Sequence, residues 1–423
     1  LGLRGQAKTR LARMMVKLLD EWVPIIKGSE INDDPLSPIS SLGKKIIEED
    51  GDDTKIDWMH RSERFYEKLA TPDVTVSDLI GDVDPIKAAS LKLSYADERV
   101  IHFGMIPRAN RCIFVINELP DLQARIQVSL FSILEEKEIQ IRGFKLRIPL
   151  DLQFIFTANP EDYTNRGSIV TPLKDRIGSQ IITHYPHTLS IAKKITKQES
   201  DIIQSSVYIP ELAHDLIEEI NFAARKSEYV DFKSGVSARM SITAFENLVS
   251  TAKRRMLINS EEKTSIRLSD FTGIIPAING KIELVYEGEE QGADQISFNL
   301  INEGVKTIFL RFFPEISKLE KPNEITPYDK ILSWFVENGS ELFIGDEFTN
   351  KEYQDSIDEI KPLDELVKKY CKDINNKDIS FIKEILLWGL SSFKKLSKNR
   401  MLDGIEFKDS LGSYLKNLNS DQI

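Results

Sequence analysis

The sequence has few of the residues that build disulfide frameworks or metal clusters. Its 423 residues include two cysteines and five histidines, and the cysteines, Cys112 and Cys371, lie far apart. This usage excludes a disulfide scaffold and is typical of a protein in a reducing compartment, so we expect a cytoplasmic location. The closest histidine pair, His184 and His187, offers two ligands, which are too few for a metal site.

Long apolar runs and an excess of positive charge are also absent. No stretch approaches the roughly 18 apolar residues that a membrane-spanning helix needs, so no membrane span is expected. Acidic residues outnumber basic ones, 67 to 56, and give a formal net charge of -11. Proteins that follow the nucleic-acid backbone are more often basic, so a nucleic-acid partner is not expected.

The length exceeds one compact core, and the apolar pattern changes along the chain. Short apolar runs alternate with helical patterns in the first part, which predicts an α/β domain with a parallel sheet over residues 1–190. Helical patterns then dominate, and we expect a helical second domain over 191–285 and a mostly helical third over 286–423. The expected buried strands include residues 112–116, 154–156 and 181–182.

Three further segments give local predictions. Residues 24–57 are rich in Pro, Ser, Asp and Gly, which indicates an irregular excursion outside the core. The acidic stretch 287–292 is a candidate boundary loop. An amphipathic helix is predicted near the start of the chain, with Leu11, Met14, Met15, Leu18, Leu19 and Trp22 on one face.

The strongest motif is a phosphate-binding loop at residues 2–9. Its sequence, GLRGQAKT, fits the pattern G-x-x-x-x-G-K-[ST] with Ala7 in place of the last glycine. Backbone N–H groups of such a loop surround a β-phosphate, Lys8 would reach the β- and γ-phosphates, and Thr9 would bind Mg²⁺. We expect Ala7 to be tolerated in an unstrained right-handed conformation. The predicted nucleotide contacts are Gly2, Gly5, Gln6, Ala7, Lys8 and Thr9.

Polar residues at the ends of two apolar strands form a second motif. The first strand ends in Asn117-Glu118, where P-loop ATPases usually have Asp-Glu. Asn117 can still bind a metal-bound water but brings no charge, and Glu118 would polarise the attacking water. Asn159 follows the next strand and could contact the γ-phosphate, although an Asn-Pro pair is also a common turn. Arg176 could serve a neighbouring subunit's nucleotide, or form an ordinary surface salt bridge.

The order of these motifs resembles that of an AAA+ ATPase. Finer features resemble the ATPase subunit of magnesium chelatases, and the resemblance covers roughly residues 1–285. It implies an AAA+ P-loop αβα sandwich with a parallel sheet, followed by a helical lid and a C-terminal helical domain. The segments that carry it are GDVD (81–84), GMIPRANR (104–111), NELPDL (117–122), TANPED (157–162) and LKDR (173–176).

The resemblance also implies roles for single residues. Asn159 would be the first sensor and Arg176 the arginine finger that acts on a neighbour. Arg239, in Ser237-Ala238-Arg239, would be the second sensor on the helical lid, and Arg166 a further contact between subunits. The implied cofactors are ATP and Mg²⁺, with Mg²⁺ held by Thr9 and, through water, by Asn117.

The same resemblance predicts partners and a ring. We expect a homo-oligomeric ring, a hexamer, together with a metal-dependent partner of the von Willebrand A type. A hairpin at 139–147 would face the ring interior. In this family a strand leads into the phosphate loop, yet only Leu1 precedes Gly2. We therefore expect a sheet without its middle strand, poorly fixed residues 1–7, and weak ATP binding.

Three functions fit these features. The leading one is an ATP-hydrolysing motor that remodels a partner protein, as a chelatase subunit or a MoxR-type chaperone. The second is an ATP-binding scaffold with little turnover, which the neutral Asn117 supports. The third is a DNA-directed motor, which the acidic net charge of -11 disfavours.

Overall fold

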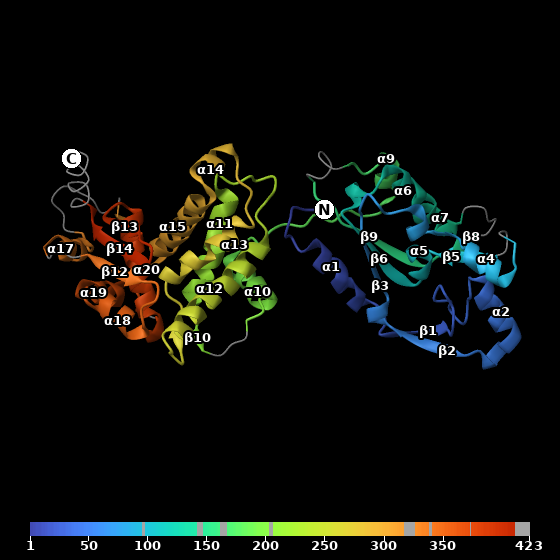
Figure 1. The fold of residues 1–423 in the computed structure, drawn as a ribbon, viewed down its shortest axis with the longest axis horizontal. Helices are drawn as coiled ribbons and strands as arrows, with labels where there is room; N and C mark the ends of the chain where they lie inside the picture. The colour runs from blue at the N-terminus through green and yellow to red at the C-terminus, as the bar shows by residue number, and fades with distance from the viewer. Residues whose placement is uncertain are drawn as a thin grey trace. The chain divides into compact units, whose positions relative to one another are not determined.

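The chain divides into two compact units, Leu1–His184 and Tyr185–Ile423, drawn in Figure 1. Each unit has its own apolar core, and each is treated separately below. The structure is a computed structural model, and it describes residues 1–94, 98–141, 147–160, 167–202, 206–316, 326–337, 341–372 and 374–410.

A parallel sheet forms the centre of the first unit, as predicted. Its three strands, in the order β3-β6-β9, are β3 (Phe65–Leu69), β6 (Cys112–Asn117) and β9 (Leu152–Phe156). All six residues of β6 are buried, because this strand has a neighbour on each side and is covered on both faces. A continuous apolar run is the sequence that such a position requires.

Different elements cover the two faces of this sheet. On one face, α1 (Lys8–Met14) places Ala12 against Ile113 and Val115 of β6. The opposite face, which carries Phe114, belongs to the larger core of the unit. That core includes residues from the helices α5 (Met105–Arg108), α6 (Ala124–Ser129) and α7 (Phe131–Glu136).

The helix after the phosphate loop differs from its prediction in length and burial. It ends at Met14, a short 3-10 turn continues to Leu18, and Trp22 already belongs to a strand. Leu11 is 54% exposed and Leu18 is 80% exposed. The small side chain of Ala12 makes the contact with the sheet instead, so most of the predicted apolar face stays at the surface.

The predicted buried strand at 181–182 is not formed. Ile181 and Ile182 are 74% and 72% exposed and lie outside any strand. Within the described residues the sheet ends at β9, so it does not extend to this segment. The backbone here pairs with Leu1: the terminal amine donates to the Ile181 oxygen over 2.7 Å, and the Thr183 N–H donates to the Leu1 oxygen over 2.8 Å.

Residues 1–7 have defined contacts, so the expectation that they are poorly fixed is wrong. The Gly2 N–H donates to the oxygen of Ala158, just after β9, over 3.3 Å. Together with the pairing of Leu1, this hydrogen bond holds the start of the loop between the end of β9 and residues 181–183.

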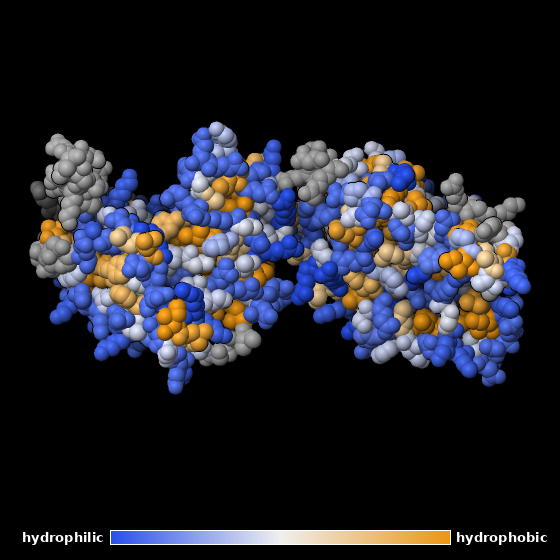
Figure 2. All heavy atoms as spheres, in the orientation of Figure 1, coloured by the Kyte–Doolittle hydropathy of each residue, from blue (hydrophilic) through white to orange (hydrophobic). Residues whose placement is uncertain are grey.

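The excursion at 24–57 is closed by a ribbon of two antiparallel strands, β1 (Trp22–Ile26) and β2 (Ile56–His60). Helix α2 (Ser41–Asp50) lies within it. Two tryptophans on this ribbon are exposed, Trp22 at 53% and Trp58 at 62%. Figure 2 shows apolar patches scattered over the face of the protein that it draws.

Shorter elements complete the first unit. β7 and β8 form the antiparallel pair expected for a hairpin, whose tip at 142–146 lies outside the described residues. The remaining elements are α3 (Val76–Leu79), β4 (Gly81–Val83), α4 (Pro85–Leu91), β5 (Ile101–Phe103), β7 (Glu138–Gln140), β8 (Arg147–Pro149) and α9 (Thr171–Arg176).

The second unit is mostly helical, and one continuous core runs from Ala213 to Phe407. This core joins the two segments that the sequence pattern separated at 285/286. The acidic stretch predicted as a loop is largely helix α14 (Tyr286–Gln291). The other helices are α10 (Leu189–Glu199), α11 (Glu211–Lys226), α12 (Ala238–Ile258), α13 (Ile275–Asn279), α15 (Ala293–Phe312), α17 (Asp329–Glu337), α18 (Asn350–Asp358), α19 (Lys361–Tyr370) and α20 (Ile379–Ser392).

The second unit also contains strands that the sequence pattern did not predict. An antiparallel sheet has the order β12-β14-β13. Its strands are β12 (Leu342–Gly345), β13 (Leu396–Arg400) and β14 (Gly404–Asp409), and a short parallel pair joins β10 (Val207–Tyr208) to β11 (Thr264–Ser265). In the part of the chain that the structure describes, no helix has the length and apolar character to cross a membrane.

Candidate active site

The phosphate-loop motif folds as a turn that leads directly into α1. Gly5 and Ala7 both have positive φ, 66° and 59°, and Ala7 accepts a hydrogen bond from the Leu11 N–H over 2.8 Å. The expectation of a right-handed Ala7 is therefore wrong. A left-handed residue with a Cβ costs roughly 1–2 kcal/mol, a cost that the glycine usual at this position would avoid.

Gly2 occupies a place that allows no side chain. A Cβ there would lie 1.9 Å from Oγ1 of Thr183 and 2.2 Å from Oε1 of Gln6. The Thr183 hydroxyl, which has one proton to donate, lies 2.9 Å from Gln6 Oε1 and 3.2 Å from the Leu1 oxygen. These contacts anchor the loop through Gln6, so Gly2 and Gln6 both contribute to its shape.

Lys8, Asn159 and Glu118 meet at the ends of the central strands. Lys8 Nζ donates to the carbonyl oxygens of Gly2 (2.6 Å) and Leu3 (3.0 Å), and also to Oδ1 of Asn159. The Asn159 amide in turn donates to Glu118 Oε2 over 3.0 Å. The three residues predicted for phosphate binding, sensing and water activation thus form one connected group.

Thr157 links the two residues that end β6, and sequence reasoning did not assign it a role. Its hydroxyl donates to Asn117 Oδ1 over 3.0 Å and accepts from the Glu118 N–H over 3.2 Å. Thr157 is 4% exposed, and Glu118 leaves the strand with a φ of 55°. The feature of the sequence that could have identified Thr157 is a hydroxyl residue directly after an apolar strand.

Glu67 is the second residue that sequence reasoning missed. It lies in β3 and accepts a hydrogen bond from Asn117 Nδ2 at Oε1 over 2.5 Å. Arg13 of α1 binds the same carboxylate in two places, from Nε over 2.8 Å and from a terminal guanidinium nitrogen over 3.1 Å. The hydrogen bond and charge of Glu67 raise the pKa of Arg13. The feature of the sequence that could have identified Glu67 is an acidic residue inside a short strand of the sheet.

The oxygen atoms at this site suit Mg²⁺ that arrives with a nucleotide. They belong to the Asn117 amide and to the carboxylates of Glu67 and Glu118. Thr9, the second residue of α1, carries the hydroxyl predicted to join them, and all of these oxygens are hard ligands. Among the described residues, no group of three or more His, Cys, Asp or Glu side chains could hold a metal alone. Mg²⁺ in nucleotide sites characteristically keeps waters and uses phosphate oxygens with one or two carboxylates.

Of the predicted arginines, Arg176 has its hydrogen-bond partners away from the group around Lys8. Arg176, at the end of α9, donates from Nε to Glu135 Oε2 over 2.8 Å, and its guanidinium lies 4.8 Å from the ring centre of Phe131. Arg239 is exposed on the first turn of α12 in the second unit, so its contact with a nucleotide stays a prediction. Arg166 lies outside the described residues.

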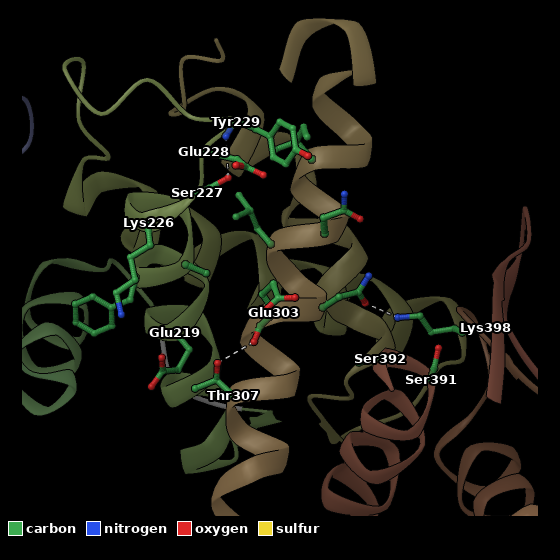
Figure 3. Close-up of a pocket in the computed structure, with 16 residues that line it drawn as sticks. Glu219, Lys226, Ser227, Glu228, Tyr229, Glu303, Thr307, Ser391, Ser392 and Lys398 are labelled. Atoms are coloured by element: carbon green, nitrogen blue, oxygen red, sulfur yellow. Dashed lines mark hydrogen bonds between the residues drawn. The ribbon is translucent and has the colours of Figure 1, made fainter. Parts of the chain in front are cut away.

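A separate cavity of about 750 Å³ lies in the second unit, among α11, α15, the end of α20 and the middle of β13 (Figure 3). It contains none of the residues predicted to contact nucleotide. Lys398 on its wall donates to Asn302 Oδ1 over 2.5 Å and lies 3.4 Å from the ring centre of Trp388. Burial lowers the pKa of Lys398 to about 7.

Residues 58–177 match the family model described as AAA domain (dynein-related subfamily). This segment contains the whole β3-β6-β9 sheet together with Asn117, Glu118, Asn159 and Arg176. The fold is therefore that of an AAA+ domain with a parallel sheet, which confirms the predicted fold class.

Solved structures with similar folds resemble the chain only loosely. A model of the complex between subunits BchI and BchD of magnesium chelatase is 15% identical, with a TM-score of 0.35, and the match covers 69% of this chain and 89% of that chain. NtrX from Brucella abortus in complex with ADP is 14% identical, with a TM-score of 0.37 and coverage of 75% and 59%. A Thermotoga maritima RuvB K64R mutant is 13% identical, with a TM-score of 0.29 and coverage of 84% and 79%.

Proposed function

We propose, on the premise that residues 58–177 form an AAA domain, that this chain is an ATP-hydrolysing motor subunit that remodels a partner protein. One observation supports this more than any other: Lys8, Asn159 and Glu118 form a hydrogen-bonded series at the strand ends. An ammonium, an amide and a carboxylate are the groups that phosphate binding, γ-phosphate sensing and water activation need.

In this proposal the chain's own groups have distinct tasks. Lys8 turns its ammonium from the loop carbonyls to the β- and γ-phosphates. Glu118 accepts a proton from the attacking water, and Asn159 keeps that carboxylate oriented. Mg²⁺, when it is bound with ATP, neutralises charge on the phosphates.

The remaining partner predictions complete the proposal. The chain acts as a homo-oligomeric ring, with Arg176 reaching the nucleotide of a neighbour and Arg239 contacting that of its own subunit. A von Willebrand A-type protein is the proposed partner, in a chelatase or in a MoxR-type chaperone system. The two free cysteines support a cytoplasmic location.

Steady-state ATP hydrolysis tests the proposal. We expect turnover by the parent chain that rises with protein concentration and with a suitable von Willebrand A-type partner. Glu118→Gln is the matched control, because it keeps the size and hydrogen bonding of the side chain and removes the base. Measurable hydrolysis by Glu118→Gln at the rate of an active parent would contradict the assignment of β6.

One observation favours a second candidate, an ATP-binding scaffold with little turnover. Asn117 has no charge, and both ends of its amide are engaged by Glu67 and Thr157. This candidate predicts tight ATP binding with no turnover above that of Glu118→Gln. The same two proteins therefore distinguish the motor from the scaffold.

A further inference from the structure

Glu67 and Asn117 lie on the same face of the central sheet. Strands β3 and β6 are paired so that Glu67 stands opposite Val115 and Leu69 opposite Asn117. Since side chains alternate along a strand, Glu67, Val115 and Asn117 point to one side. That side is the face covered by α1, where Val115 contacts Ala12.

Asn117 itself brings no charge to the position where related sites have an aspartate. Its Oδ1 accepts from the Thr157 hydroxyl, and its Nδ2 donates to Glu67 over 2.5 Å. The amide is thereby fixed at both ends and 6% exposed. The negative charge directly beside it belongs to Glu67.

Helix α1, which carries Thr9 and its proposed Mg²⁺-binding hydroxyl, faces the Glu67 carboxylate. Arg13 binds Glu67 at both oxygens, and Thr9 precedes Arg13 by four residues on α1. Residues four apart share one side of a helix, so Thr9 lies on the side that approaches Glu67. Side chains of Glu67 and Arg13 are 23% and 60% exposed, which leaves the carboxylate accessible to water.

We propose that Glu67 is a metal-positioning residue, which supplies through water the negative charge that Asn117 lacks toward the Mg²⁺ of a bound nucleotide. This inference rests on the proposed nucleotide site. The carboxylate stands on β3, the strand beside β6, and the Asn117 amide donates a hydrogen bond to it. Arg13 is then the counter-ion that Glu67 has in the absence of Mg²⁺.

A competing explanation is that Glu67 only pairs with Arg13 to hold α1 on the sheet. The two explanations differ in what Arg13→Gln does. If Glu67 serves the ion pair alone, Arg13→Gln has the same effect as Glu67→Gln. If Glu67 supports the metal, Arg13→Gln leaves the Glu67 carboxylate in place. The half-saturating Mg²⁺ concentration of that variant is then no higher than in the parent.

The experiment measures binding of a fluorescent ATP analogue by the full chain, first in EDTA and then across a MgCl₂ titration. For Glu67→Gln we expect unchanged affinity in EDTA and a half-saturating Mg²⁺ concentration raised roughly 10- to 100-fold, the usual loss when a group that supports a metal is removed. Asn117→Asp combined with Glu67→Gln restores the charge at the end of β6. This double variant should return the Mg²⁺ requirement to the parental range.

Control measurements show whether a changed Mg²⁺ titration comes from loss of any nearby charge, from unfolding or from loss of the nucleotide site. Glu63→Gln removes an exposed carboxylate close by and should leave the Mg²⁺ titration unchanged. Circular dichroism checks that each variant is folded. A parental Mg²⁺ titration for Glu67→Gln, or equal shifts in Glu67→Gln and Arg13→Gln, would overturn this inference alone. Absence of analogue binding by the parent in EDTA and in Mg²⁺ would overturn the proposed function, and this inference with it.

Discussion

The Lys8 ammonium donates to the side chain of Asn159, 151 residues further along the chain. One residue follows a glycine-containing loop and the other follows strand β9. Their contact places the start of the chain at the ends of the central strands, next to Glu118. The nucleotide site proposed here depends on that contact.

Lys8→Ala should abolish detectable ATP binding, because the phosphates lose the Lys8 ammonium, which lies among the oxygens of Gly2, Leu3 and Asn159. Lys193→Ala, in the second unit, is a control for removing a lysine that forms ion pairs. Isothermal calorimetry or equilibrium dialysis measures the binding. Retained affinity in Lys8→Ala would show that residues 2–9 do not hold the phosphates.

Thr157→Val should lower both stability and turnover. The substitution keeps the shape but leaves Asn117 Oδ1 and the Glu118 N–H without this hydroxyl, at a cost of about 1–3 kcal/mol. Thr157→Ser keeps the hydroxyl and should stay near the parent in turnover. Urea unfolding and steady-state ATPase rates check the pair. If valine and serine behaved alike, the hydroxyl would have no role in placing Glu118.

Ala7→Gly should stabilise the loop. Glycine removes the cost of a Cβ at a φ of 59°, roughly 1–2 kcal/mol, and this gain is offset by about 0.4–1 kcal/mol of extra freedom in the unfolded chain. We expect a net gain of between about 0 and 1.6 kcal/mol, measured by thermal or urea unfolding. Ala12→Gly, inside α1, is the matched control and should destabilise. Destabilisation by Ala7→Gly would argue against a left-handed Ala7.

Arg176→Ala should reduce hydrolysis only where subunits assemble, because the arginine is proposed to act on a neighbour's ATP. Mixing Arg176→Ala with Lys8→Ala subunits should recover part of the activity, since one interface of a mixed ring contains an intact site. The measurement is ATPase rate against mixing ratio. Glu135→Gln releases Arg176 from its partner within the chain and should not lower activity in assembled protein. No recovery in mixtures shown to co-assemble would count against a shared site.

Glu384 should make the second unit less stable as pH rises. Burial raises the pKa of this carboxyl from 4.5 to about 7, while Tyr353 and the Leu268 N–H donate to it. Between pH 4.5 and 7 the unfolded chain has lost the proton that the folded chain keeps. Stability therefore falls through this window, by up to about 3 kcal/mol, and is constant for this group above it.

Urea unfolding at pH 5 and pH 8 measures this effect in the parent and in Glu384→Gln. The variant should lose the part of the pH dependence that Glu384 causes. Glu365→Gln, an exposed carboxylate paired with Lys330, is the control and should keep it. Identical pH profiles for parent and Glu384→Gln would show that this carboxyl is not protonated in the folded chain near neutral pH.

The sequence by itself determined some local elements and supplied most of the residues of the proposed site. The apolar run 112–116 predicts a buried strand because a strand with two neighbours needs apolar side chains in continuous order, and β6 is such a strand. The motif at 2–9 predicted a loop followed by a helix, and α1 begins at Lys8. These outcomes depend on nearest neighbours in the chain, which a sequence shows directly.

The tertiary structure decided what distant residues do together. Thr157 and Glu67 gain their roles only because β9 and β3 flank β6, an arrangement that no local pattern contains. The exposure of Ile181 and Ile182 likewise follows from where the described sheet ends. Ala7 takes a left-handed conformation because the loop must turn into α1, and this requirement overrides the residue's own preference. Contacts between segments far apart in sequence fix such choices, so they lie beyond the reach of local propensity.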